Sequence, residues 1–160
     1  MKDSVLKYLN QLEMYKTAIK NLHWDSKSMS EHKLWDDIAS AVSENQDEIA
    51  EIAQGVLGTI ELNKLKPESY TISNSKATLN DILKDTKEFY TTIDGDDYIG
   101  LRSVVESWIG ELNKFVYLMD FCLKEDIKRR LVIKEMKSKL DRLTEADYRR
   151  IINVSLKKIL

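Results

Sequence analysis

The sequence contains few residues that interrupt helices, with one Pro and five Gly among its 160 residues. In a helix interior Gly costs about 1 kcal/mol and Pro about 3 kcal/mol relative to Ala. Because long stretches of the chain contain neither residue, the composition predicts an all-α fold.

Cysteine and long hydrophobic runs are also scarce. The single Cys122 cannot form a disulfide within the chain, which fits a reducing, intracellular compartment. No apolar run reaches the roughly 18 residues that a membrane helix requires, and the first residues lead directly into an amphipathic pattern, so no signal peptide is expected. Together these features predict a cytoplasmic protein that does not bind membranes.

The net charge is only -2, but the charged residues are unevenly distributed along the chain. Residues 124–160 carry 12 Lys and Arg against 6 Asp and Glu, whereas residues 1–123 carry 13 against 21. An acidic body and a basic tail attract partners of opposite charge. We therefore expect a helical bundle over residues 1–124 and a basic C-terminal helical extension over residues 125–160.

Hydrophobic residues recur at steps of three and four, as amphipathic helices require. The pattern predicts bundle helices over about residues 4–23, 28–57, 76–93 and 97–124, and two helices in the extension over about 126–142 and 145–159. Ser28 with Glu31, and Thr144 with Asp147, have the spacing of helix N-caps. Residues 58–75, which include the lone Pro67, predict a long loop that crosses the bundle.

The only two His residues, His23 and His32, lie near the junction of the first two expected helices. His32 and Asp36 are four residues apart and share a helix face, and Asp47 and Glu51 repeat this spacing. The eleven residues from Asp36 to Asp47 correspond to three helical turns plus about 20°. The two pairs therefore lie on one stripe of the second helix.

One ion cannot contact both pairs of a single straight helix. Eleven residues rise about 16 Å along the axis, whereas metal–ligand bonds are about 2 Å long. Two antiparallel copies of the helix would bring Asp47 and Glu51 of one chain beside His32 and Asp36 of the other. A two-fold axis would then create two such sites, and His23 would complete the donor set.

Two imidazoles and two or three carboxylates suit iron, manganese or zinc better than calcium or magnesium. Each pair alone has a simpler explanation, since acidic residues on a helix face are usually solvated and His at a helix start often acts as a cap. The metal site is favoured because both His and both carboxylate pairs fit one geometry. Trp24 and Tyr15, close in sequence, are expected mainly to pack, with radical quenching as the alternative.

These motifs resemble the Dps family, the dodecameric mini-ferritins that protect DNA during starvation. His23-Trp24 resembles the His-Trp pair at the end of the family's first helix. His32-x3-Asp36 followed by Asp47-x3-Glu51 resembles its ferroxidase signature, including the eleven-residue gap between the two Asp residues.

Leu112-Asn113-Lys114-Phe115-Val116-Tyr117-Leu118-Met119-Asp120 resembles a further family motif, Leu-Asp-Lys-Phe-Leu-Trp. The resemblance covers about residues 5–124. The nine residues from His23 to His32 are a few fewer than is usual in the family, and about 36 residues follow the expected end of the domain. The chain has no Glu-x-x-His pair, which is typical of sites built inside one bundle.

The resemblance implies a ferritin-like four-helix bundle and a ferroxidase that stores iron and protects against oxidative damage. His23, His32 and Asp36 would come from one subunit and Asp47 and Glu51 from its two-fold mate. Each di-iron site would oxidise Fe(II) with hydrogen peroxide or dioxygen, and the subunits would assemble as a homo-dodecamer.

Two alternatives remain open from the residues. The chain could be a non-catalytic assembly protein that binds a partner through its C-terminal helices. It could also be a DNA-binding protein whose basic tail, including Lys128, Arg129 and Arg130, contacts phosphates. Acidic residues interleaved in the same tail fit a solvated, salt-bridged helix pair equally well.

Overall fold

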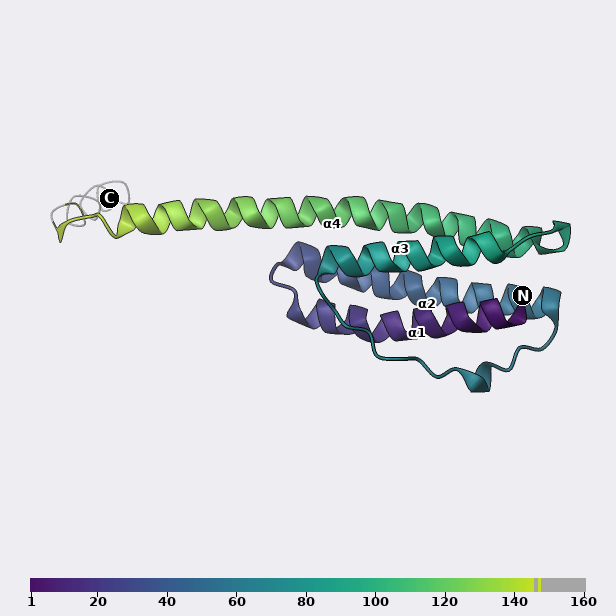
Figure 1. The fold of residues 1–160 in the computed structure, drawn as a ribbon. Coiled ribbons are helices and arrows are strands. Elements are labelled where there is room, and N and C mark those ends of the chain that lie inside the picture. Colours follow the sequence, from purple (N-terminus) through teal and green to yellow (C-terminus); the bar gives the residue numbers. More distant parts are fainter. Residues whose placement is uncertain (146, 148–160) are drawn as a thin grey trace, which may run out of the picture. The chain divides into compact units, whose positions relative to one another are not determined.

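A computed structural model describes residues 1–145 and 147, and every regular element within them is helical (Figure 1). The all-α prediction is confirmed for this part of the chain. None of the described helices is long and apolar enough to cross a membrane. The α-helices are α1 (Lys2–Asp25), α2 (Met29–Leu57), α3 (Ser75–Thr92) and α4 (Ile99–Leu140), with the 3-10 helices η1 (Leu62–Lys64) and η2 (Asp96–Tyr98) before α3 and α4.

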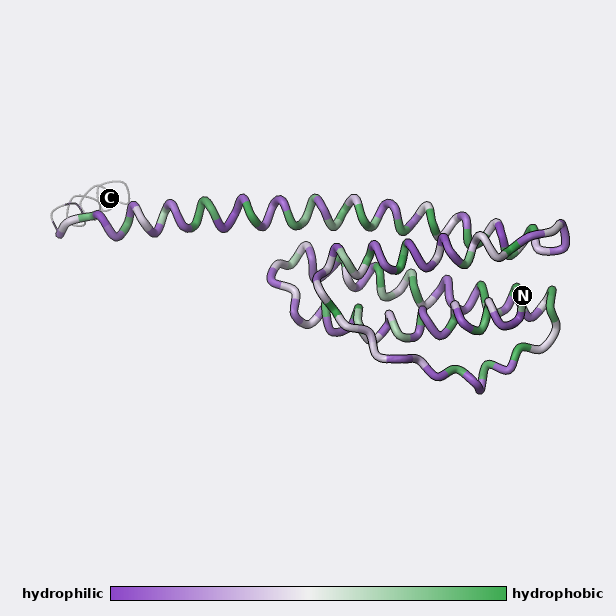
Figure 2. Tube along the Cα trace, viewed as in Figure 1, coloured by the Kyte–Doolittle hydropathy of each residue, from purple (hydrophilic) through white to green (hydrophobic). Residues whose placement is uncertain are grey.

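The chain divides into two compact units, Met1–Leu123 and Lys124–Leu160. In the first unit α1 packs along α2 and α3, and hydrophobic residues recur turn by turn along the helices (Figure 2). This spacing turns one side of each helix into a shared core. The largest fully buried side chains of that core come from all four helices: Tyr8, Leu9, Leu12, Ile19, Trp35, Ile38, Ile49, Leu79, Ile82, Leu101, Trp108 and Leu112.

A buried hydrogen-bonded relay joins three of these helices. The Trp108 indole donates to the Tyr8 hydroxyl at 3.1 Å, and that hydroxyl lies 2.8 Å from Thr86 Oγ1. Thr86 in turn donates to the Ile82 carbonyl at 2.7 Å. The Tyr8 ring stacks on Phe89 with ring centroids 4.4 Å apart, so these polar groups are satisfied within an apolar core.

The expected end of the fourth helix at residue 124 is wrong. The sequence predicted separate helices over 97–124 and 126–142, but α4 continues without a break from Ile99 to Leu140. Lys124-Glu125-Asp126 contains neither Gly nor Pro, and a change in charge alone does not end a helix. The next expected helix, 145–159, lies outside the described residues except for residues 145 and 147.

The start of α2 is fixed by an N-cap and by a bond to α3. The Ser28 hydroxyl accepts from the Glu31 backbone N–H at 3.2 Å, as the spacing predicts. The Glu31 carboxylate accepts from the Ser75 hydroxyl at 2.6 Å, and both residues are buried. This bond holds the first turn of α2 against the first turn of α3.

Ser75→Ala is expected to lower the free energy of unfolding by about 1–3 kcal/mol, because it leaves the buried Glu31 carboxylate without this donor. Urea denaturation at neutral pH measures the change. Ser73→Ala is the matched control, since Ser73 is exposed in the preceding loop and its replacement should change stability by no more than about 0.5 kcal/mol. Equal effects of the two substitutions would contradict the role of the Glu31–Ser75 bond.

The connection between α2 and α3, residues 58–74, runs along α1. Near its beginning, the Thr59 carbonyl accepts from Lys2 Nζ at 3.0 Å. Near its end, the Tyr70 ring packs edge-on against Tyr15, with centroids 5.1 Å apart. Because Lys2 begins α1 and Tyr15 lies past its middle, the connection follows α1 in the direction of its chain.

Two buried tyrosines should make the first unit sensitive to alkali. Burial raises the pKa of Tyr8 and of Tyr15, and the bond that Tyr15 donates to Asp85 at 2.8 Å raises the Tyr15 pKa further. In the unfolded chain the phenol ionises near pH 10. The stabilisation is therefore fully present below about pH 10 and is lost as the pH rises above it, because only the unfolded state releases the proton.

The expected loss above pH 10 is about 1.4 kcal/mol per pH unit for each such tyrosine. Urea unfolding over a pH series measures this slope, which should become shallower in Tyr15→Phe. Tyr117, which is 69% exposed, provides the control Tyr117→Phe, and its slope should match the parent chain. An unchanged slope in Tyr15→Phe would show that this phenol does not control alkaline stability.

Candidate metal centre

The structure brings His23, His32 and Asp36 together where α1 and α2 meet. One potential ligand atom from each of these residues lies within 4.8 Å of the others. With bonds of about 2.1 Å, donors on opposite sides of one ion are roughly 4.2 Å apart. Movements of a few tenths of an ångström would therefore allow all three to contact a single ion.

Both imidazoles are oriented through their Nδ1 atoms. His32 Nδ1 lies 3.1 Å from the His23 carbonyl oxygen, so it carries the proton and donates. His23 Nδ1 lies 2.9 Å from Asp36 Oδ1. Metal-binding His residues typically donate one ring N–H to a carbonyl or carboxylate and coordinate through the other nitrogen. These bonds use Nδ1 of both rings, so Nε2 is the nitrogen that each ring has left to offer a metal.

The cluster is compact but open to solvent. The two imidazole rings are 3.8 Å apart between centroids and tilted by 39°. The His23 side chain is 20% exposed and that of Asp36 is 60% exposed. The site therefore has preoriented nitrogens on its inner side and a carboxylate on its outer side, where an ion or a second chain can approach.

A shallow pocket continues from the cluster across the outer surface of α1 and α2. Lys16, Lys20 and Trp24 line it from α1, and Ala39 and Ser43 line it from α2 beyond Asp36. Lys20 Nζ lies 5.1 Å from the centroid of the Trp24 ring, which is 67% exposed. The surface beside the cluster is thus partly cationic.

Asp47 and Glu51 lie further along the same helix and do not join the cluster. Both are exposed, and the only group of three or more possible ligands among residues 1–145 and 147 is His23, His32 and Asp36. The spacing along α2 places Asp47 about 16 Å from Asp36. Within one chain, two of the five proposed ligands are therefore remote from the other three.

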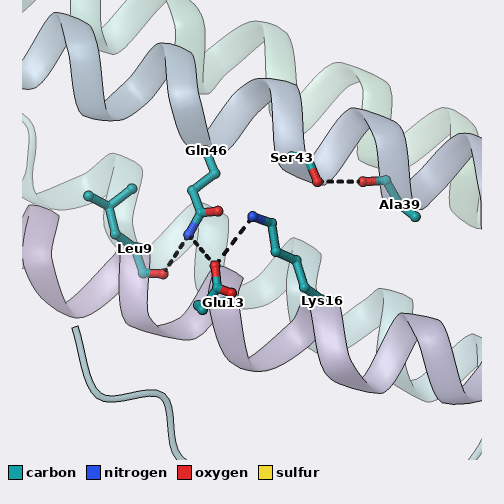
Figure 3. A network of polar contacts seen from close by, with 6 residues as sticks. All are labelled: Leu9, Glu13, Lys16, Ala39, Ser43 and Gln46. Atoms are coloured by element: carbon teal, nitrogen blue, oxygen red, sulfur yellow. Dashed lines mark hydrogen bonds and ion pairs between the residues drawn. The ribbon is translucent and has the colours of Figure 1, made fainter. Parts of the chain in front are cut away.

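A buried amide fixes the rotation of α2 against α1 (Figure 3). Gln46 Nε2 donates to the Leu9 carbonyl at 3.1 Å and to Glu13 Oε2 at 3.2 Å, and Glu13 pairs with Lys16 at 3.3 Å. Asp47 follows Gln46 by one residue, or about 100° around the helix. Because Gln46 faces α1, Asp47 is held on the outer side of the pair.

Several features of this region were not predicted from the sequence. The bonds made by Gln46 and by the Asp36 carboxylate depend on how α1 and α2 pack. Lys16, Lys20 and Trp24 follow at steps of four, which is a signal for one shared face of α1. Tyr15 is buried and bonded to Asp85, as packing requires, whereas Trp24 is exposed rather than packed in the core.

Comparison with protein-family models, with curated proteins and with solved structures finds no match to this chain. The fold and the site by themselves define a helical protein with a His–His–Asp cluster at the junction of two antiparallel helices. An activity has to be inferred from the chemistry of that cluster and from the side chains around it.

Proposed function

We propose that this chain is a Dps-type mini-ferritin that binds and oxidises Fe(II) at di-iron sites shared by two subunits, and that its oligomer stores the iron. The observation that carries the proposal is the preoriented cluster of His23, His32 and Asp36. Asp47 and Glu51 complete the donor set from a second chain, because they are exposed on the stripe of α2 that carries His32 and Asp36.

The order of the helices supports a ferritin-like bundle. The Glu31–Ser75 bond places the starts of α2 and α3 side by side. The 29 residues of α2 span about 43 Å, so the connection over residues 58–74 has to return along the length of the bundle. A long crossover between the second and third helices is the topology of ferritin-like proteins.

Charge on the outer face of α1 and α2 favours an antiparallel partner. The end nearest the cluster carries Lys16 and Lys20 beside the pocket, and the other end carries the exposed acidic residues Asp47 and Glu51. A two-fold axis perpendicular to these helices would place Asp47 and Glu51 of each chain near the lysine-lined pocket of its mate. The two lysines thus favour the arrangement of subunits that the metal ligands require.

The donor set fits iron as a substrate. Imidazole nitrogens bind Fe(II), and carboxylate oxygens stabilise the more highly charged Fe(III). With hydrogen peroxide as oxidant, two Fe(II) each lose one electron, the O–O bond breaks, and two protons are taken up to give two water molecules. With an exposed carboxylate and a pocket beside it, the cluster leaves room for oxidant and water. Manganese and zinc are the competing ions for these ligands.

Fe(II) added anaerobically to the purified full chain, followed by hydrogen peroxide, tests the proposal. Iron oxidation should proceed faster than in protein-free buffer, and the oxidised iron should remain in solution with the protein. Zinc added beforehand should inhibit the reaction by occupying the same ligands. Oxidation at the rate of buffer alone, with precipitation of the iron, would exclude a ferroxidase and leave a non-catalytic assembly protein as the better reading.

A further inference from the structure

The exposed surface of α2 is strongly acidic between the two proposed groups of ligands. From Asp36 to Glu51 the chain contains six acidic residues and no basic one. All six are exposed: Asp36, Asp37, Glu44, Asp47, Glu48 and Glu51. Two lysines of α1, Lys16 and Lys20, line the pocket beside this helix, but Lys16 already pairs with Glu13 at 3.3 Å. This surface therefore carries more negative charge than its lysines balance.

The shared site of the proposed function brings this negative charge together. In an antiparallel pair, Asp47 and Glu51 of one chain lie beside Asp36 of the other, and the two-fold axis repeats the arrangement at a second site. Oxygen atoms that share an ion through bonds of about 2.1 Å lie within roughly 4.2 Å of each other. Like charges at this distance repel each other. Without a cation, the pairing of two chains is therefore opposed at both sites.

A single chain and a pair of chains offer a metal ion different numbers of ligands. The single chain brings together three residues, His23, His32 and Asp36, whereas Asp47 and Glu51 are exposed and lie outside this cluster. A pair offers five at each site, and the ion neutralises carboxylates that otherwise repel each other. An ion therefore binds the pair more tightly than the single chain, and by linkage it strengthens the pairing by a corresponding factor.

We propose that transition-metal ions control the association of two chains through α2, so that chains with metal pair and chains without metal associate at least tenfold more weakly. The inference rests on the shared site of the proposed function and adds that occupancy of this site regulates assembly. Lys16 and Lys20 reduce the repulsion without removing it, because each chain supplies two lysines against six acidic side chains of α2.

Sedimentation of the full chain tests this dependence. Metal is first removed with EDTA, and Zn²⁺ is then added at about two equivalents per chain, which should lower the dissociation constant for pairing at least tenfold. Zn²⁺ is the probe because it takes imidazole and carboxylate ligands but undergoes no redox change. Mg²⁺ has the same charge but prefers oxygen ligands, so the same concentration should change the constant by less than about twofold.

Two double variants separate ligation from charge. Asp47→Asn with Glu51→Gln removes two ligands and two negative charges, so metal-free pairing should strengthen while the response to Zn²⁺ disappears. Glu44→Gln with Glu48→Gln is the matched control, because it removes the same charge from exposed positions of the same helix and keeps all five proposed ligands. Pairing of this control should still tighten at least tenfold with Zn²⁺.

Salt provides an independent measure of the repulsion. Because dissolved ions screen like charges, about 0.5 M NaCl should strengthen the pairing of metal-free parent chains, whereas it would weaken an interface held by opposite charges.

Equal dissociation constants with EDTA and with Zn²⁺, an equal effect of Mg²⁺, weaker metal-free pairing in salt, or the same Zn²⁺ response in both double variants would overturn metal-controlled pairing. Iron oxidation by chains whose pairing ignores Zn²⁺ would overturn this inference and leave the proposed function intact. Pairing that depends on Zn²⁺ without iron oxidation would support the inference and exclude only the ferroxidase.

Discussion

His32→Ala is expected to lower the initial rate of peroxide-driven Fe(II) oxidation by roughly 100-fold or more. The substitution removes one of two preoriented nitrogen donors, and even the loss of groups that only orient a ligand typically costs 10–100-fold. The fold should persist, because His32 is only half-buried and makes no hydrogen bond to α3 or α4 among the described contacts. Stopped-flow oxidation under limiting iron measures the rate.

Asp37→Asn is the matched control for this experiment. Asp37 is an exposed carboxylate on α2 that neighbours Asp36 but lies outside the cluster. Its replacement removes one negative charge next to Asp36 and should change the rate by less than about twofold, since exposed charges are strongly screened. A rate loss of the same size in Asp37→Asn and His32→Ala would mean that surface charge, rather than the His–His–Asp cluster, governs the reaction.

Trp108→Ala is expected to lower the free energy of unfolding by about 3–5 kcal/mol, the usual range for removing a large aromatic side chain from a core. Trp108 is fully buried, and its indole donates to Tyr8. The substitution therefore opens a cavity and also removes a donor from the relay through Tyr8 and Thr86. Urea denaturation followed by circular dichroism measures the loss.

The contrasting substitution is Trp24→Ala. Trp24 is 67% exposed, and its only described ring contact is with Lys20. Its loss should cost no more than about 1 kcal/mol, the value of an exposed cation–π pair. Similar destabilisation by the two Trp substitutions would contradict the assignment of Trp108 to the core and of Trp24 to the surface.

The helices of the first unit could be predicted because their signals are local. Hydrophobic spacing of three and four and the Ser28 cap depend on neighbours in the sequence. The end of the expected fourth helix could not be placed in this way. A transition from apolar to charged residues near Lys124 changes what a helix face contacts, but it does not change whether the backbone remains helical.

The candidate site was predictable in composition but not in geometry. The spacing of His32 and Asp36 requires only one helix, so their shared face follows from the sequence. The bond from His23 to Asp36 joins two helices, and the bond that Ser75 donates to Glu31 joins residues 44 positions apart. Such contacts depend on packing angles that no local pattern encodes. Glu31 is an example: its spacing from Ser28 predicts an N-cap, but its carboxylate accepts a hydrogen bond from Ser75 of α3.

Subunit complementation tests the shared site most directly. His32→Ala and Glu51→Ala chains, each expected to be inactive, would be unfolded together in equal amounts and refolded, with each variant refolded alone as control. If the ligands come from two chains, a mixed pair contains one site with both defects and one intact site. Half of the pairs are mixed, so the mixture should recover about one quarter of the parent activity. A mixture that stays as inactive as its components, despite forming mixed oligomers, would contradict the shared site.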